Sequence, residues 1–335
     1  MVNQGRRRAA IIGLGGSALS ADETSMLHAT PPLGVILFAR NIAGAASLRA
    51  LTAAIRETLG EATPILIDQE GGRVARLHGP DWPVFPPAAS FEGRPAQNAY
   101  ANAALIGLEC AGLGLNVVCA PVLDLRLPEG HGIIGDRAFS ADPAEVRRLG
   151  REYLLGLQAA GCVPVIKHIP GHGRARADSH LELPRVSATR EELALDCAPF
   201  AALAGLGAWA MTAHILYERL DAELPATLSP RVIARVIRGA IGFEGFLVSD
   251  DLAMKALTGQ PAALAQASIS AGCDAVLHCT GDLAETAALL ADCPALSDAA
   301  MERLDAARAA TLSRREILDP AALMAMRHAA MARSA

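Results

Sequence analysis

A stretch near the middle of the chain, KHIPGHGRARADSHLELP at Lys167–Pro184, gathers side chains that titrate close to neutral pH. It holds three of the nine histidines, His168, His172 and His180, and Asp178 stands two residues before the last of them. Because glycines and prolines interrupt the stretch, we expect a loop rather than a helix or a strand. Two kinds of chemistry suit such a loop: binding of a metal ion, and proton transfer by a carboxylate–imidazole pair.

The metal alternative would use the three histidines and Asp178 as zinc ligands. His168 and His172 are four residues apart, as on one face of a helix, but Pro170 prevents a helix between them. No other compact ligand spacing is present, so we expect no bound metal. In the interpretation that we favour, Asp178 orients the His180 imidazole, which then gives or takes a proton. A polar surface loop without chemistry is the third interpretation.

The composition limits the classes of protein to which the chain belongs. Its 335 residues are 52% hydrophobic, enough for a large core, and no unbroken apolar run of about 18 residues predicts a membrane span. Acidic and basic residues are interspersed with a net charge of −5, which argues against a nucleic-acid surface. The seven cysteines are scattered without a C-x-x-C pair, which is typical of a reducing compartment.

Eight short apolar runs recur along the chain and are too short for helices. They do not alternate with polar residues, which is the pattern of strands that are buried on both faces. The runs begin at Ala9, Gly34, Pro64, Leu115, Cys162, Ala208, Gly245 and Asp274. Ala- and Leu-rich stretches of helical length separate them, and three of these begin with helix start signals, at Asp142, Thr189 and Ser229.

This alternation predicts an α/β fold, a single (β/α)8 barrel of the TIM type at about residues 9–290. One or two extra helices are expected at about residues 296–335, so that residues 1–335 form one catalytic domain. A doubly wound open sheet is the alternative fold. The N-terminal RRRAAIIGLGGSALSA resembles a signal peptide. Its glycines interrupt the apolar run, however, and the barrel needs this segment as its first strand, so we expect no cleaved signal.

Charged and polar residues follow six of the eight runs, at the point where each strand should end. They are Arg40 and Asn41; Asp68, Gln69, Glu70, Arg73 and Arg76; Asp124; Lys167 and His168; His214; and Ser249, Asp250 and Asp251. The C-terminal ends of the strands of a parallel barrel meet at one face, and buried charges are costly unless they are paired or used. The sequence therefore predicts one polar pocket. Strand alternation turns Ser249 and Asp251 one way and Asp250 the other, and leaves open which faces inward.

Four separated motifs resemble those of a known family, in the same order. KHIPGHG at Lys167, followed by DSH and LP, is similar to the bacterial β-N-acetylglucosaminidases of glycoside hydrolase family 3, the cytoplasmic enzymes of cell-wall recycling. IDQEGGRVAR from Ile67, GDRAF from Gly135 and VSDDLAM from Val248 resemble that family as well. The resemblance spans about residues 9–290, and Ile169 stands where the family usually has phenylalanine.

The resemblance implies a cytoplasmic retaining glycosidase that needs no cofactor and no metal ion. It implies that Asp250 is the nucleophile, and that His180 is the general acid/base, assisted by Asp178. It assigns the contacts with the sugar to Asp68, Arg76, Arg137, Lys167 and His168. The implied substrate is terminal N-acetylglucosamine on muropeptides that end in 1,6-anhydro-N-acetylmuramic acid. We expect no nucleic-acid or membrane partner, and a monomer rather than an obligate oligomer.

Three alternative functions stay open at this point. A glycoside phosphorylase would use the same residues, because a neutral histidine repels phosphate less than a carboxylate does. A metal-dependent hydrolase would use the histidine cluster, and a non-catalytic barrel would only bind sugar. The two tryptophans, Trp82 and Trp209, are few for the aromatic platforms of a long polysaccharide cleft, which favours a small carbohydrate as the partner.

Overall fold

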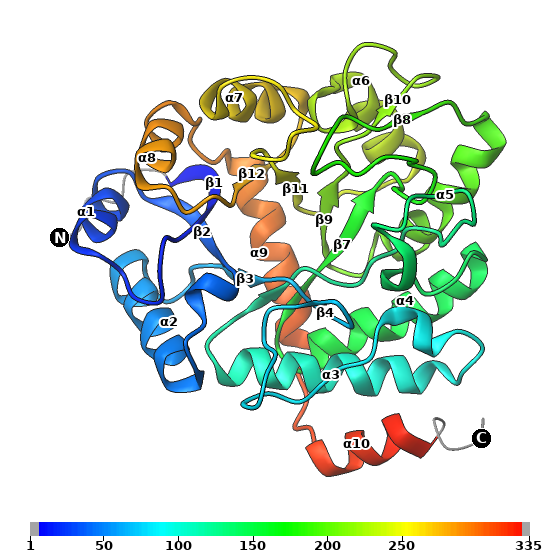
Figure 1. Ribbon diagram of the computed structural model, residues 1–335, viewed down its shortest axis with the longest axis horizontal. Helices are drawn as coiled ribbons and strands as arrows, with labels where there is room; N and C mark the ends of the chain where they lie inside the picture. The colour runs from blue at the N-terminus through cyan, green and yellow to red at the C-terminus, as the bar shows by residue number, and fades with distance from the viewer. Residues whose placement is uncertain (1–6, 330–335) are drawn as a thin grey trace.

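Eight parallel strands close into a barrel at the centre of the computed structural model, which describes residues 7–329 (Figure 1). The barrel strands are β1 (Arg8–Gly13), β2 (Pro32–Leu37), β3 (Ile65–Ile67), β6 (Val117–Val118), β7 (Val163–Ile169), β9 (Trp209–Thr212), β11 (Leu247–Asp251) and β12 (Ala275–His278). β1 pairs with both β2 and β12, which closes the sheet. The predicted (β/α)8 fold is confirmed, and the open sheet is excluded.

Strand β6 is shorter than the apolar run that predicts it. Pro121 has no N–H to donate to a neighbouring strand, and pairing beyond Val118 is reduced to a bridge between Val122 and Lys167. Two small sheets lie outside the barrel and pair β4 (Gln69–Gly71) with β5 (Val74–Ala75), and β8 (Arg185–Val186) with β10 (Leu216–Tyr217). Strand β8 directly follows the loop that the sequence singled out, so this loop is fixed at its far end.

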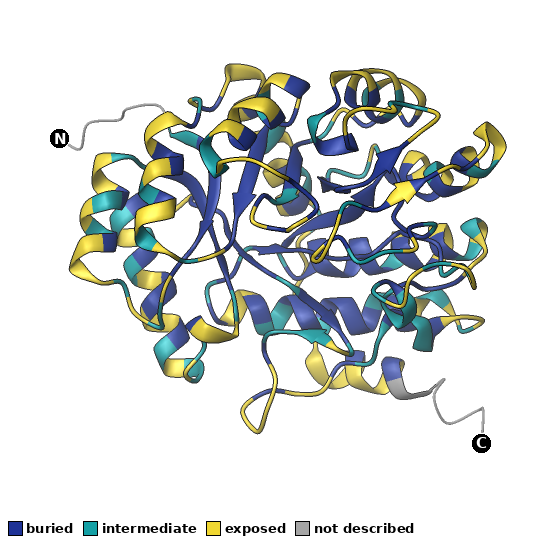
Figure 2. Cartoon of the chain, turned by 45° about the horizontal axis from the view of Figure 1, so that its top comes forward, coloured by how far each residue is buried: buried dark blue, intermediate teal, exposed yellow. Residues whose placement is uncertain are grey.

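Most of the helices surround the barrel and turn a buried face toward it. The α-helices are α1 (Ala21–Ala29), α2 (Ala45–Leu59), α3 (Ala96–Gly112), α4 (Pro143–Ala159), α5 (Arg190–Leu203), α6 (Pro230–Val232), α7 (Pro261–Ala271), α8 (Leu283–Asp292), α9 (Asp298–Ser313) and α10 (Pro320–Ala329). Shorter helical turns are η1 (Ala39–Asn41), η2 (Ala88–Phe91), η3 (Gly135–Arg137) and η4 (Ala226–Leu228), and η5 (Ile233–Ala240) is a π-helix. Figure 2 shows buried strands and inner helix faces beneath exposed outer faces. In α2 the buried Leu48, Leu51 and Ile55 follow the three- and four-residue spacing of a helix.

The predicted helix start signals cap their helices. The side chains of Asp142 and Thr189 each accept a backbone N–H from the first turn that follows, and Thr189 forms a reciprocal capping box with Glu192. Ser229 also caps its helix, but α6 ends after one turn and continues as the π-helix η5. These caps satisfy N–H groups that have no partner within the helix.

Helices α9 and α10 follow the barrel, in agreement with the sequence. In Figure 1 α9 crosses behind the strands, at the N-terminal end of the barrel. A cavity of about 370 Å³ lies between them, with Val163 and Trp209 on the barrel side and Leu304 on α9. Helix α10 packs on α3, where Asn98 Nδ2 donates to the Met326 carbonyl at 2.9 Å. In a barrel this end serves stability, so the chemistry is expected at the opposite end.

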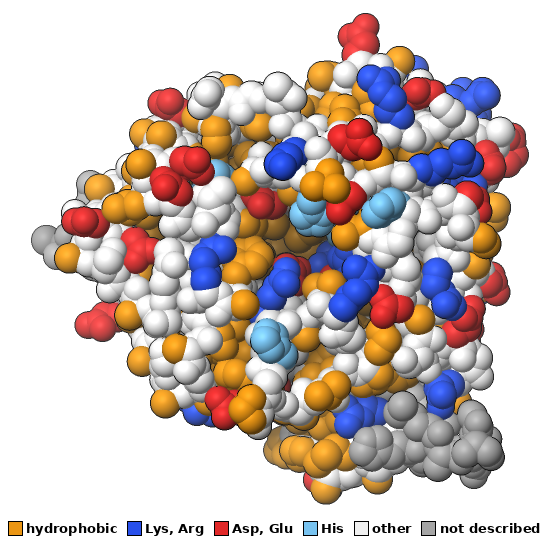
Figure 3. Space-filling model, in the orientation of Figure 1, with side chains coloured by type: hydrophobic (Ala, Val, Ile, Leu, Met, Phe, Trp, Pro, Cys, Tyr) orange, Lys and Arg blue, Asp and Glu red, His pale blue; other side chains and the backbone are white. Residues whose placement is uncertain are grey.

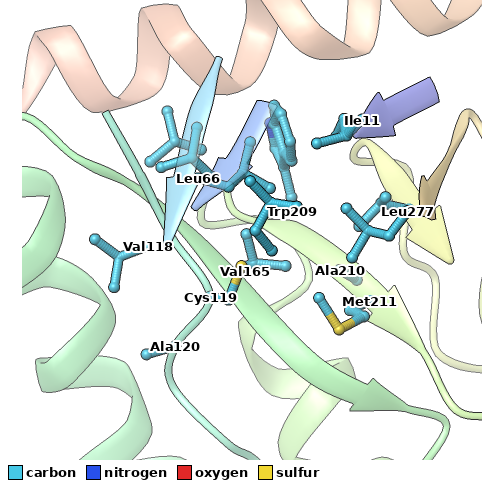
Figure 4. Packing of buried hydrophobic residues seen from close by; sticks show 14 of the residues in the cluster. Ile11, Leu66, Val118, Cys119, Ala120, Val165, Trp209, Ala210, Met211 and Leu277 are labelled. Atoms are coloured by element: carbon cyan, nitrogen blue, oxygen red, sulfur yellow. The ribbon is translucent and has the colours of Figure 1, made fainter. Parts of the chain in front are cut away.

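The barrel interior is filled with apolar side chains. Figure 4 shows Ile11, Leu66, Val165, Trp209 and Leu277, which come from different strands and pack together. Each of them is at most 1% exposed. Trp209 therefore serves packing and is not a platform for sugar. Among residues 7–329 no helix has the length and apolar character that would let it cross a membrane.

Candidate active site

Most of the predicted site residues line one pocket at the C-terminal end of the barrel. The pocket has a volume of about 260 Å³ and is visible in Figure 3 as a hollow near the centre of the face, with charged and histidine side chains around it. Its wall includes Asp68, Arg76, Arg137, Lys167, His168, His180 and Asp250. Apolar side chains, among them Phe38, Met211, Met254 and Leu277, also line the pocket, as do His172 and Ser179. Asp178 does not line the pocket but pairs with His180.

Asp68, which follows β3, is held by two cations. Lys167 Nζ lies 2.9 Å from Asp68 Oδ1, and Arg76 Nη2 donates to Oδ2 at 3.1 Å. Burial acts to raise the pKa of Asp68, but the charges of Lys167 and Arg76 outweigh it and hold this pKa well below its usual range. An ionised carboxylate is therefore available in the pocket to accept hydrogen bonds from sugar hydroxyls.

Glu70 completes this charge network behind the pocket wall. Arg137 Nε and Nη2 donate to its two oxygens at 2.8 and 2.9 Å, and Lys167 Nζ lies 2.6 Å from Oε1. Burial acts to raise the pKa of Glu70, but Lys167 and Arg137 outweigh it and lower this pKa. Burial acts to lower the pKa of Lys167, but Asp68 and Glu70 outweigh it and raise this pKa. Glu70 therefore fixes the positions of Lys167 and Arg137, the two cations that the sugar is expected to meet.

Asp124 is a buried carboxylate that binds two histidines. It pairs with His168 Nδ1 at 2.7 Å and accepts the His172 backbone N–H at 2.6 Å. Burial acts to raise the pKa of Asp124, but the neighbouring His168 outweighs burial and lowers it. The ionised Asp124 thus fixes the His168 ring at the pocket wall and anchors the start of the loop after β7.

Asp250 lies in the pocket beside the imidazoles of His168 and His214. Burial acts to raise its pKa, but His168 and His214 outweigh burial, and the net effect is a lowered pKa. Its Oδ1 accepts the Asp251 N–H at 2.8 Å, and no hydrogen bond from the described part of the chain reaches Oδ2. An ionised carboxylate with one free oxygen has the state that a nucleophile requires.

The Asp251 carboxylate, in contrast, accepts hydrogen bonds from the backbone. Its Oδ1 accepts the N–H groups of Ala253 and Cys279, each at 3.0 Å, and burial raises its pKa. The strand alternation predicted from the sequence is wrong here, because the pairing of β11 with β12 shifts register between Val248 and Asp251. As a result both Asp250 and Asp251 reach the pocket wall.

The loop after β7 carries the Asp178–His180 pair at the rim of the pocket. Asp178 Oδ1 accepts the His180 N–H and pairs with the ring Nδ1, each at 2.8 Å. Burial acts to raise the pKa of Asp178, but the contacts with His180 outweigh it and lower the pKa. The His180 side chain is 59% exposed. With Nδ1 engaged by Asp178, the exposed Nε2 is left to exchange a proton.

Comparison with known proteins identifies the family. Residues 9–313 match the glycosyl hydrolase family 3 N-terminal domain. The chain belongs to glycosyl hydrolase family 3. The resemblance that rested on four motifs is confirmed, and the chain is a glycoside hydrolase of this family.

Relatives in family 3 are similar over most of their length. The beta-hexosaminidase of Alkalilimnicola ehrlichii is 41% identical over 309 residues, which cover 88% of this chain and 87% of the relative. That of Xylella fastidiosa is 38% identical over 288 residues, 83% and 85% of the two chains. Native NagZ from Neisseria gonorrhoeae has a TM-score of 0.85 and 28% identity, over 97% of this chain and 98% of that one.

Sequence reasoning found the residues that face the pocket of this family 3 enzyme, but not those that hold them. Glu70 and Asp124 were placed at strand ends without a partner. A signal for Glu70 is its spacing of two residues from Asp68, which puts both on one side of an extended segment. Within residues 7–329 no group of three or more His, Cys, Asp or Glu side chains is arranged to hold a metal ion.

Proposed function

We propose that this enzyme, a β-N-acetylhexosaminidase of glycosyl hydrolase family 3, is a retaining exo-β-N-acetylglucosaminidase. It releases terminal, non-reducing N-acetylglucosamine from cytoplasmic muropeptides that end in 1,6-anhydro-N-acetylmuramic acid, with or without peptide. The observation that carries the proposal is an ionised Asp250 on the wall of a pocket whose rim bears the Asp178–His180 pair. The name Beta-hexosaminidase of the relatives supports an amino sugar as substrate, and the similar structure of a family 3 beta-N-acetylglucosaminidase from Paenibacillus supports N-acetylglucosamine.

In the first step Asp250 attacks the anomeric carbon of the sugar. Its free Oδ2 forms the new carbon–oxygen bond, while the electron pair of the glycosidic bond leaves with the aglycone oxygen. His180 gives that oxygen a proton, and the carboxylate of Asp178 stabilises the pair by holding Nδ1. The product of this step is a glycosyl-enzyme ester on Asp250.

In the second step the same groups act in reverse. The neutral His180 takes a proton from water, the water oxygen bonds to the anomeric carbon, and Asp250 leaves as a carboxylate. Two displacements at one carbon retain its β configuration. The interactions with His168 and His214 lower the pKa of Asp250 despite its burial, and they favour its departure as an anion.

The sugar is held by the charge network on one side of the pocket. Asp68 accepts hydrogen bonds from sugar hydroxyls, and Lys167 and Arg76 donate hydrogen bonds to hydroxyl or carbonyl oxygens. A pocket of about 260 Å³ favours a single ring over an extended chain. Both tryptophans are buried, Trp82 at 8% and Trp209 at 1% exposure, so neither supplies an exposed platform.

The experiment that tests the proposal compares two leaving groups in His180→Ala. A sugar alkoxide needs the proton in order to leave, whereas a nitrophenolate hardly does. The rate of glycosylation should therefore fall by about 10²–10⁴-fold with the disaccharide of N-acetylglucosamine and 1,6-anhydro-N-acetylmuramic acid. With nitrophenyl N-acetylglucosaminide the rate should fall much less. Asp178→Ala should act in the same direction. Single-turnover kinetics isolate the glycosylation step.

The matched control is His28→Ala, because His28 is an exposed histidine on α1. It should leave both rates unchanged. Equal losses on the two substrates in His180→Ala would show that His180 has a binding or structural role, and would remove the acid/base assignment.

A further inference from the structure

The loop between β7 and β8 is packed firmly at its beginning. A Cβ on Gly173 would lie 2.2 Å from the Leu125 carbonyl oxygen, so the two backbones are in close contact at this glycine. Arg174 Nε donates to Asp196 at 2.7 Å, and the Ala175 carbonyl accepts a backbone N–H from a neighbouring segment. Residues 170–175 therefore form a fixed base.

The tip of the loop, residues 176–183, carries the Asp178–His180 pair and is attached quite differently. The hydrogen bonds of Asp178 and His180 stay within the tip. Among residues 7–329, each hydrogen bond that joins the tip to another segment involves Ser179. Ser179 is 3% exposed, whereas the His180 side chain beside it is 59% exposed. The hydrogen bonds that attach the tip to the rest of the protein are thus made by one buried residue, Ser179, which stands between Asp178 and His180.

Ser179 links the tip to two other segments of the chain. Its hydroxyl lies 3.4 Å from His172 Nε2, and its carbonyl accepts the Ala256 N–H at 3.1 Å. The His172 backbone is tied to Asp124, and Ala256 belongs to the segment that follows Asp250 on β11. A shift of Ser179 would therefore move His180 relative to the nucleophile.

His172 is suited to receive the serine at neutral pH. Burial, aided by the neighbouring His168, lowers the pKa of His172 to about 4. The neutral ring forms one hydrogen bond, between its Nε2 and the Ser179 hydroxyl. Its Nδ1 has no hydrogen-bond partner in the described part of the chain. Ser179 is the only side-chain hydrogen-bond partner of the ring in the described residues, and the ring also lines the pocket and packs edge-on against His168.

We propose that Ser179 is a positioning residue that docks the Asp178–His180 tip against His172 and Ala256, and so sets the alignment of the proton donor with Asp250. The inference rests on the proposed function of His180. It predicts that Ser179 acts only on steps that need the proton. Loss of the hydroxyl removes one of the two contacts and leaves the backbone contact with Ala256 in place.

The test measures glycosylation by the disaccharide and by nitrophenyl N-acetylglucosaminide in Ser179→Ala. Because one hydrogen bond is lost, the rate of glycosylation should fall about fivefold with the disaccharide and less than about twofold with the nitrophenyl substrate. In a His180→Ala background the same change should have no further effect. His172→Phe, which keeps a planar aromatic ring but has no ring nitrogen, should reproduce the pattern. The double variant with Ser179→Ala should be no slower than the worse single variant.

Ser268→Ala is the matched control, because Ser268 is a fully buried serine on α7 whose hydroxyl has no partner in the described residues. It should leave both rates unchanged. Equal losses on both substrates in Ser179→Ala, a further loss in the His180→Ala background, or no loss at all would each overturn the proposal. If His180→Ala itself shows no dependence on the leaving group, the acid/base assignment fails first and the role of Ser179 falls with it.

Discussion

Removal of the Lys167 ammonium should destabilise the fold, because it takes a cation from a buried charge network. The ammonium lies 2.9 Å from Asp68 and 2.6 Å from Glu70, and the side chain is 3% exposed. Arg76 and Arg137 remain in Lys167→Met, so two cations still face two carboxylates. Removal of one partner from a buried pair lowers the free energy of unfolding by about 3–5 kcal/mol. Because the two arginines still neutralise the two carboxylates, we expect a loss near the lower end of this range, about 3 kcal/mol.

The loss should depend on pH with a defined sign. The pKa values of Asp68 and Glu70 are lowered in the folded protein, because their cations outweigh the effect of burial. Such groups stabilise the fold above their unfolded pKa values of about 4, and the stabilisation is lost as the pH falls below them. The difference between the natural protein and Lys167→Met should therefore be complete at pH 7 and smaller below about pH 4.

The assay is urea denaturation at several pH values, with Lys255→Met as the control. Lys167 and Lys255 are the only lysines in the sequence, and Lys255 is exposed. Its removal should change the free energy of unfolding by less than about 0.5 kcal/mol. A loss of under about 1 kcal/mol in Lys167→Met at pH 7, or a loss that persists undiminished in acid, would refute the counter-charge argument.

Three further predictions concern the chemistry. Asp250→Asn should lower turnover by at least about 10³-fold with the fold intact. Asp251→Asn should cost less, because an amide oxygen still accepts the Ala253 and Cys279 N–H groups; a dead Asp251→Asn beside an active Asp250→Asn would reverse the assignment. Activity should survive exhaustive EDTA treatment, whereas loss on chelation with recovery on added zinc would indicate a metal-dependent hydrolase. In phosphate buffer the product should be free N-acetylglucosamine; formation of its 1-phosphate would identify a phosphorylase.

The sequence by itself determined the elements and the end of the barrel that carries the chemistry. Strands buried on both faces must be apolar throughout, so the runs from Ala9 to Asp274 predicted all eight barrel strands, with β6 shorter than its run. Helix capping depends on residues within one turn of the chain. The sequence around Asp142 and Thr189 therefore predicted where α4 and α5 begin. Closure of parallel strands brings their C-terminal ends together, and this predicted that Asp68 and Lys167 would share a pocket.

Tertiary structure alone decided which side chains hold the others in place. Alternation is a local rule, but the register of β11 is set by its hydrogen bonds to β12, and that shift brought both Asp250 and Asp251 to the wall. The partners of Glu70 and Asp124 are Arg137 on η3 and His168 on β7, which lie far away in the sequence, so no spacing within one motif reveals them. The burial of Ser179 likewise depends on His172 and on the segment after β11, which meet only when the barrel closes.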